Sequence, residues 1–319
     1  MLQLPFMAKA KQVACPDRSP DPQKWLAELL RLRFDEVLNQ RGAALDPANV
    51  DGVHDMRVAT RRLRGALRDF GELTDCPSIK RVRKGLKNLA DELGAVRDHD
   101  VAILALEKLK AESENRDVQK GIQLLIQERS ALREEEYLDL LKVISVTSIE
   151  DLQQKFTSAV DKALGQRELF QPTSLQEAGH DVIAARLKDL LEFGSSIYEP
   201  FNEKALHKLR IASKRLRYAI ELFGTCWNGA LDAFAEDISK LQSNLGEVHD
   251  CDAWIASLGK RLKGKNGEAK NEASSDAEAW LLSEFVRKRS KEYREALELW
   301  SEWKATDFTV RLSAAISLA

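Results

Sequence analysis

Hydrophobic residues recur three and four positions apart along most of the chain. Leu86, Leu89 and Leu93 are one example, and this spacing places apolar side chains on one face of an α-helix. We find no convincing alternating pattern of the kind that marks a half-buried β-strand. Eight prolines leave residues 78–171 and 201–319 free of proline, and both tracts are rich in good helix formers. The pattern therefore predicts an all-α protein.

One long segment of this pattern occurs twice. A gapless alignment matches VHDMRVATRRLRGALRDF (residues 53–70) to LHKLRIASKRLRYAIELF (residues 206–223), 153 positions later. Residues 89–109 align in the same way to residues 241–261, 152 positions later. A period near half the chain length predicts an internal duplication that forms two helical bundles related by a pseudo-two-fold axis. We expect a flexible leader over residues 1–20, a first repeat over 21–165 and a second over 172–319.

Each copy of the repeated segment, taken as a helix, has an apolar face and a basic face. The apolar face carries Met56, Thr60, Leu63, Leu67 and Phe70 in the first copy, and Leu209, Ser213, Leu216, Ile220 and Phe223 in the second. The basic row consists of His54, Arg57, Arg61, Arg64 and Arg68 in the first copy, and of His207, Arg210, Lys214 and Arg217 in the second. A basic row that occurs twice is a stronger signal for a binding function than either copy alone.

The overall composition conceals this local charge. The 319 residues include 49 Lys and Arg against 51 Asp and Glu, and the formal net charge of −2 argues against a protein that is basic over its whole surface. Residues 54–87 nevertheless carry +6, residues 204–217 carry another +6 without any acidic residue, and the rest of the chain carries −14. Like charges at helical spacing repel one another. The rows therefore predict an anionic ligand, with an ordinary solvated helix face as the alternative.

The two histidines of the rows are expected in the first turn of their helices. Asp51 or Gly52 is the predicted N-cap of the first helix, and Asn202 that of the second. Free N–H groups and the helix dipole favour an anion at such a terminus, and Arg at the next turn supplies forked donors for phosphate oxygens. A structural capping role for His54 and His207 is the alternative.

Further basic residues extend the candidate site. The first half carries an additional row at helical spacing, made up of Lys80, Arg83, Lys84 and Lys87. The matching stretch of the second half, residues 232–240, keeps only Lys240, so we expect the first half to make more phosphate contacts. His249 aligns with Arg97 and is predicted as a phosphate contact in its place.

A second repeated motif, L-G-x-V-x-D-x-D, is acidic. We expect its aspartates to cap the following helix or to hold neighbouring basic side chains in place, and they are Asp98, Asp100, Asp250 and Asp252.

The duplicated H-x-x-R-[VI]-x-x-[KR]-R-L-R helix, with the acidic motif that follows it, resembles the CHAD domain, the conserved-histidine α-helical domain. The resemblance covers the chain from about residue 22. It implies two pseudo-symmetric four-helix bundles, a basic central surface or pore, and binding of inorganic polyphosphate without hydrolysis. The matching positions, and hence the implied ligand contacts, are His54, Arg57, Arg61, Arg64, His207, Arg210, Lys214 and Arg217. The E-x-E-x-K strand of the triphosphate-tunnel hydrolases that often accompany CHAD domains is not found, so we expect a stand-alone domain.

Three other functions compete with polyphosphate binding. A basic groove also suits RNA, although base readers usually interleave aromatic residues for stacking, and these two helices carry only Phe70, Tyr218 and Phe223. His-Asp dipeptides at His54, His180 and His249 are typical of metal-dependent phosphohydrolases, but Lys208 follows His207 in the second copy. An acidic protein partner is the third candidate. We expect a binding protein that is not an enzyme and needs no metal or cofactor.

The sequence also predicts a location. Four scattered cysteines without a C-x-x-C pair indicate a reduced protein, and the N-terminus is a poor signal peptide. The apolar runs that we find are too short to span a membrane. We therefore expect a cytoplasmic protein without a membrane partner, associated with polyphosphate granules.

Overall fold

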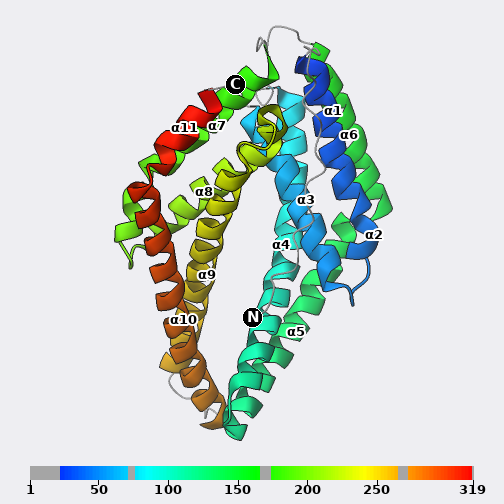
Figure 1. Cartoon of the computed structure of the whole chain (residues 1–319). Helices are drawn as coiled ribbons and strands as arrows, with labels where there is room; N and C mark the ends of the chain where they lie inside the picture. The colour runs from blue at the N-terminus through cyan, green and yellow to red at the C-terminus, as the bar shows by residue number, and fades with distance from the viewer. Residues whose placement is uncertain (1–21, 71–75, 166–173, 265–271, 318–319) are drawn as a thin grey trace. The chain divides into compact units, whose positions relative to one another are not determined.

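The computed structural model of the chain describes residues 22–70, 76–165, 174–264 and 272–317, and the predicted leader over residues 1–20 lies outside them. Within these ranges all regular structure is helical (Figure 1), which confirms the all-α prediction. The helices of the first half are α1 (Pro22–Asn39), α2 (Arg41–Ala44), α3 (Val50–Asp69), α4 (Pro77–Glu112), α5 (Arg116–Val143) and α6 (Val146–Gly165). Those of the second half are α7 (Leu175–Glu192), α8 (Glu203–Phe223), α9 (Asp232–Lys263), α10 (Glu272–Ala305) and α11 (Phe308–Ser317), with the short 3-10 helices η2 (Gly194–Tyr198) and η3 (Gly224–Trp227).

The order of elements in the second half follows that of the first. Helices α1 and α7 both have 18 residues and begin 153 positions apart, at Pro22 and Leu175. A short helical segment comes next in each half, followed by the basic helix, which has 20 residues in α3 and 21 in α8. Two long helices and a final shorter helix complete both halves, and the second half adds η3 before the first of these long helices. The repeated segments of the sequence therefore take equivalent places in the order of elements.

The chain forms two compact units that do not follow the predicted division at residues 165 and 172. The first unit contains the described residues within 22–102 and 130–179, and the second contains 103–129 and those from 180 onward. The tips of α4 and α5 thus belong to the second unit, because their apolar side chains pack against α9 and α10. The members of this cluster are Leu106, Val118, Ile122, Leu125, Ile126, Cys251, Leu258, Ala277, Leu281 and Phe285.

Each unit buries the apolar face predicted for its basic helix. All ten residues of the two predicted faces are buried. The two hydroxyl groups among them are satisfied within their own helices: Thr60 Oγ1 donates to the carbonyl of Met56 at 2.8 Å, and Ser213 Oγ donates to that of Leu209 at 2.9 Å. In the first unit α1 packs against α3 and α6, and in the second α9 packs against both α8 and α10. The buried face fixes the rotation of each basic helix, and the basic row is left beside the next long helix.

None of the helices described is both long enough and apolar enough to cross a membrane.

Candidate functional site

The two histidines of the basic rows do not lie in the first turn of their helices. Asn49, and not Asp51 or Gly52, caps α3, and its side chain accepts hydrogen bonds from the backbone N–H groups of Asp51 and Gly52. Asn202 caps α8 as predicted, accepting from the N–H of Ala205 at 3.1 Å. His54 and His207 are therefore the fifth residues of their helices, beyond the first turn, where backbone N–H groups pair within the helix. The predicted first-turn position is wrong, and the side chains, not free backbone groups, form the candidate site.

The first arginine of each row lies against a glycine of the neighbouring helix. A Cβ atom added at Gly94 of α4 would lie 3.8 Å from Nε of Arg57, and one added at Gly246 of α9 would lie 3.6 Å from Nε of Arg210. Both glycines belong to the repeated L-G-x-V motif. Because glycine has no side chain, each arginine can lie close to the backbone of the next long helix.

The first unit surrounds His54 with arginines from two helices. Arg57 and Arg61 come from α3 and Arg97 comes from α4, and with His54 they form what we call the first basic cluster. The pKa of His54 is lowered to about 4, mainly by burial and also by the charges of Arg97, Arg61 and Arg57, against the opposing effect of Asp51. Both ring nitrogens of His54 are buried, and neither has a hydrogen-bond partner among the described residues. The imidazole is therefore neutral at physiological pH.

Arg97 is the site residue that the sequence analysis missed. It is only 8% exposed, and burial lowers its pKa, opposed by the nearby carboxylates of Asp100, Asp51, Asp55 and Asp98. The signal that could have found it was the alignment of His249 with Arg97, which assigns the two residues equivalent places.

The remaining predicted cations of the first unit form two groups: three arginines that lie near one another, and three exposed lysines. Arg64 is half-buried, and its pKa is lowered mainly by burial and also by Arg68 and Arg83, whereas Asp91 opposes this. Arg68 donates to the carboxylate of Asp69 at 3.2 Å. The structure thus brings Arg64, Arg68 and Arg83 together between α3 and α4.

The other three predicted cations of this group lie exposed on α4: Lys80, Lys84 and Lys87. Lys87 forms an ion pair with Asp91 at 2.5 Å.

The second unit pairs two histidines where the first pairs a histidine with an arginine. The rings of His207 on α8 and His249 on α9 lie 4.8 Å apart between centroids. Burial lowers the pKa of His207, followed by the effects of His249, Arg210 and Lys214. We call these four residues the second basic cluster. His249 Nδ1 also lies 3.1 Å from a carboxylate oxygen of Asp250.

Arg217, predicted as a ligand contact, is buried within the second unit. It is 4% exposed, and its guanidinium donates to Gln242 at 2.9 Å and to Glu221 at 2.8 Å. The guanidinium also lies 4.7 Å from the ring centre of Tyr218. These contacts hold the Arg217 side chain inside the unit. Lys240, the one cation kept in its stretch of α9, forms ion pairs with Glu236 and Asp237.

The repeated aspartates do not cap helices, and two of them hold basic side chains. All four lie inside α4 or α9, so no helix begins after them. Asp100 accepts a hydrogen bond from Arg133 at 2.5 Å, and Asp252 accepts one from Arg289 at 2.5 Å. The second aspartate of each motif therefore takes the holding role that the sequence analysis offered as one of two possibilities.

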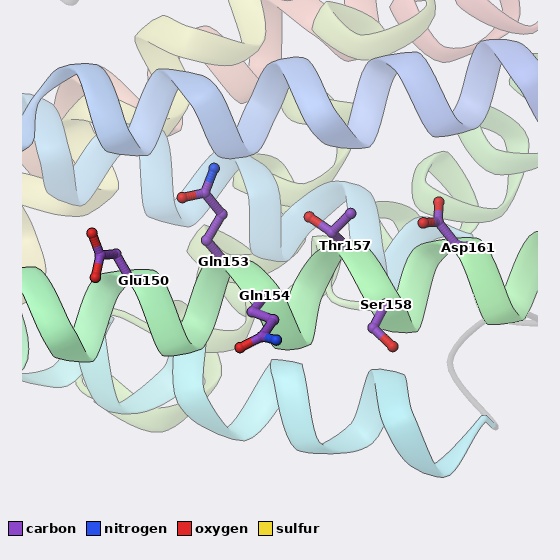
Figure 2. A pocket seen from close by; sticks show the side chains of 6 residues that line it. All are labelled: Glu150, Gln153, Gln154, Thr157, Ser158 and Asp161. Atoms are coloured by element: carbon purple, nitrogen blue, oxygen red, sulfur yellow. The ribbon is translucent and has the colours of Figure 1, made fainter.

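Elsewhere the described residues offer little that suggests chemistry. They contain no group of three or more His, Cys, Asp or Glu side chains placed to hold a metal ion. A hollow on α6 is lined by Glu150, Gln153, Gln154, Thr157, Ser158 and Asp161 (Figure 2), and Asp161 accepts a hydrogen bond from Arg31. Its lining comes from one helix and includes two carboxylates, so it does not suit an anion.

These features define a class of protein: an all-α chain with two helical units, each carrying a basic helix whose arginine lies against a glycine of the next helix. Comparison with known protein families identifies the family. The model of the CHAD domain matches residues 28–259, and the chain belongs to this family.

Solved structures with the same fold include a CHAD domain from the plant Ricinus communis, which is 21% identical, covers 93% of this chain and 96% of its own, and has a TM-score of 0.70. PptA from Streptomyces chartreusis is 16% identical, covers 89% of this chain and 100% of its own, and has a TM-score of 0.62.

Among curated proteins, the uncharacterized protein Rv2226 of Mycobacterium tuberculosis strain H37Rv is 27% identical over 216 residues. The uncharacterized protein MT2285 of strain CDC 1551 is 26% identical over 216 residues. Each match covers 63% of this chain but only 38% of the relative. The chain therefore matches less than half the length of these relatives.

Proposed function

We propose that this chain binds inorganic polyphosphate through its two basic clusters and does not hydrolyse it. The observation that carries the proposal is the meeting of basic side chains from two helices in each unit: Arg57 and Arg61 with Arg97, and Arg210 and Lys214 with His249. Like charges that meet in this way repel one another, whereas a polyanion bound between them attracts the cations of both helices. Arginine forks and lysine ammonium groups are common ligands of phosphate oxygens. Membership of the CHAD family supports the same ligand.

Polyphosphate suits these helices better than RNA does. Sequence-tolerant binding of single-stranded nucleic acid usually relies on aromatic side chains that stack on bases. The aromatic residues of the two basic helices are buried: Phe70 is 3% exposed, Tyr218 is 7% exposed and Phe223 is fully buried. A surface of Arg, Lys and His without accessible rings fits a ligand that is phosphate throughout.

A role in binding, without catalysis, is part of the proposal. A metal-dependent phosphohydrolase needs His and carboxylate ligands that converge on a metal. Two of the three His-Asp dipeptides use their carboxylates locally instead: Asp181 lies 3.1 Å from His180, and Asp250 lies 3.1 Å from His249.

Calorimetry with long-chain polyphosphate, triphosphate, ATP and single-stranded RNA at matched phosphate concentration tests the ligand. We expect long-chain polyphosphate to bind most tightly, with an affinity that falls steeply with added salt. Equal or tighter binding of RNA would contradict the proposal. Release of phosphate from polyphosphate in the presence of Mg²⁺ or Mn²⁺ would contradict the non-catalytic role.

Charge reversal tests the site. Arg57→Glu with Arg61→Glu, and Arg210→Glu with Lys214→Glu, should each weaken binding at least about tenfold while leaving helicity intact. The matched control is Lys142→Glu with Lys155→Glu, which reverses two exposed lysines on α5 and α6. Unchanged affinity in both site variants would place the site elsewhere.

We also propose that the protein acts in the cytoplasm on polyphosphate granules. A fluorescent fusion of the chain should colocalise with granules in cells that accumulate polyphosphate, and the Arg57→Glu, Arg61→Glu variant should not. A diffuse signal for both proteins would contradict this location.

A further inference from the structure

Arg133 lies outside the first basic cluster but connects α3 and α4, the two helices that carry this cluster. Arg133 of α5 donates from Nε to the carboxylate of Asp100 on α4 at 2.5 Å, and from Nη2 to the carbonyl of Pro47 at 3.3 Å. Pro47 lies in the turn that leads to Asn49, the cap of α3. Tyr137, one turn further along α5, donates its hydroxyl to the carbonyl of Ala44 at 3.1 Å. One face of α5 therefore ties the start of α3 to the part of α4 that contains Arg97.

The same three contacts occur in the second unit. Arg289 of α10 donates from Nε to Asp252 on α9 at 2.5 Å and from Nη2 to the carbonyl of Pro200 at 2.6 Å. The hydroxyl of Tyr293 donates to the carbonyl of Ile197 at 2.6 Å. Pro200 lies just before Asn202, the cap of α8. An arrangement of this detail, present in both units, points to a requirement of the site and not to the packing of one loop.

Electrostatics supplies the reason for such a tether. Arg57 and Arg61 on α3 face Arg97 on α4, and their like charges push the two helices apart at the point where a ligand would bind. Arg133 and Arg289 each bond a side-chain carboxylate through Nε and a main-chain carbonyl through Nη2. These donors have fixed, separate positions on one rigid guanidinium, which a compact lysine ammonium does not reproduce. Both arginines are largely shielded from solvent, with side chains 14% and 13% exposed.

We propose that Arg133 with Tyr137, and Arg289 with Tyr293, are positioning residues that set the distance between the basic helix and its neighbouring long helix in each unit. They touch no ligand and act through the turn before α3 or α8. This inference rests on the proposed function in so far as the distance they set matters for polyanion binding.

The second unit provides the test, because its two helices each contribute an imidazole. The variant Asp252→Asn with Arg289→Gln removes both charges of the α9–α10 ion pair together, so that no buried charge is left alone. The matched control is Arg261→Gln with Glu278→Gln, which removes another α9–α10 ion pair, with an Nε–Oε1 distance of 2.7 Å. Arg261 bonds to Glu278 on α10 and to Glu128 on α5. Arg289→Lys adds a variant that keeps the charge beside Asp252 but loses the second bond.

Two readouts separate positioning from stability. The first is the nuclear Overhauser contact between the imidazole protons of His207 and His249, assignable by single replacement because the chain has only five histidines. The second is the affinity for long-chain polyphosphate, measured below the melting temperature of every variant. We expect the Asp252, Arg289 variant and Arg289→Lys to lose the imidazole contact and about tenfold in affinity, as loss of outer partners of ligand residues commonly does. The Arg261, Glu278 control should keep the contact and stay within about twofold of the native affinity.

An unchanged imidazole contact in the Asp252, Arg289 variant would overturn the inference, as would an equal loss of affinity in the control. A native protein that binds no polyphosphate would overturn the proposed function alone, because the imidazole contact still reports whether Arg289 positions α8 against α9.

Discussion

Arg57 of α3 lies beside Gly94 of α4, and Arg210 of α8 lies beside Gly246 of α9 in the same way. The glycine gives the guanidinium a place against the helix backbone that any longer side chain would occupy. The size of the side chain at position 94 should decide whether Arg57 keeps this place. Substitutions of increasing size at Gly94 therefore test the arrangement.

Gly94→Ala should leave the arginine in place and Gly94→Leu should displace it. A Cβ at this position meets Arg57 at 3.8 Å, an ordinary contact distance, so alanine should stabilise α4 by up to about 1 kcal/mol through its better helix propensity. Leucine should lower the affinity for polyphosphate by about tenfold. Urea unfolding and calorimetry on the two variants check this, and equal affinities for the two would show that Arg57 needs no space at Gly94.

Acid should destabilise the fold through His54. Its pKa is about 4 in the folded protein and near 6.5 in the unfolded chain, so the unfolded state binds the proton more readily. Stability should therefore fall as the pH decreases from about 6.5 to about 4, by less than about 3 kcal/mol because the site is partly screened by solvent. Urea unfolding at pH 7.5 and 4.5 measures the loss. His54→Gln should show a smaller loss than the native protein, and an identical loss in the variant would assign the effect to other groups.

Binding should also depend on pH, and the second basic cluster should supply that dependence. A polyanion beside His207 favours its protonated form, against the burial and the neighbouring cations that lower its pKa in the free protein. Affinity for polyphosphate should therefore rise as the pH decreases from 7.5 to 5.5. Calorimetry across this range should show a flatter profile for His207→Gln, which removes the imidazole that the polyanion protonates. A profile as steep as the native one would contradict this assignment.

Substitutions at Arg217 and Arg210 should separate an effect on stability from an effect on binding. Arg217→Met removes hydrogen bonds to Gln242 and Glu221 inside the unit and should cost about 1–3 kcal/mol in the free energy of unfolding, with affinity retained. Arg210→Met should do the reverse, lowering the affinity with a change in stability of less than about 1 kcal/mol. Thermal unfolding and calorimetry on both variants provide the comparison. A loss of affinity in folded Arg217→Met would restore Arg217 to the site.

Helical periodicity was sufficient to predict the basic row on α3 but not Arg97 on α4. The row from His54 to Arg68 follows from the spacing of a single helix, because the buried face of Met56, Leu63 and Leu67 fixes its direction. Arg97 could not be found in this way, since its place beside His54 depends on how α4 packs against α3. The duplication itself remains a prediction from the sequence, in keeping with the equivalent contacts of Arg133 and Arg289.

Charge patterns also could not separate ligand contacts from internal ion pairs. Arg217 continues the row of α8 at the correct spacing, yet Glu221 lies one turn further on the same face and pairs with it. A carboxylate at the end of a basic row is the signal that separates the two cases. The tips of α4 and α5 are a similar case, because their apolar faces indicate burial but not which helices cover them.

The cluster around Leu106 and Leu258 makes the two halves of the chain depend on one another for folding. A fragment that ends near residue 165 would leave the tips of α4 and α5 without α9 and α10, and would expose Leu106, Ile122 and Ile126 to water. The converse fragment, beginning near residue 172, would lack one wall of its own core. The two repeats that the sequence predicts are therefore not expected to fold as two separate proteins when the chain is divided at that point.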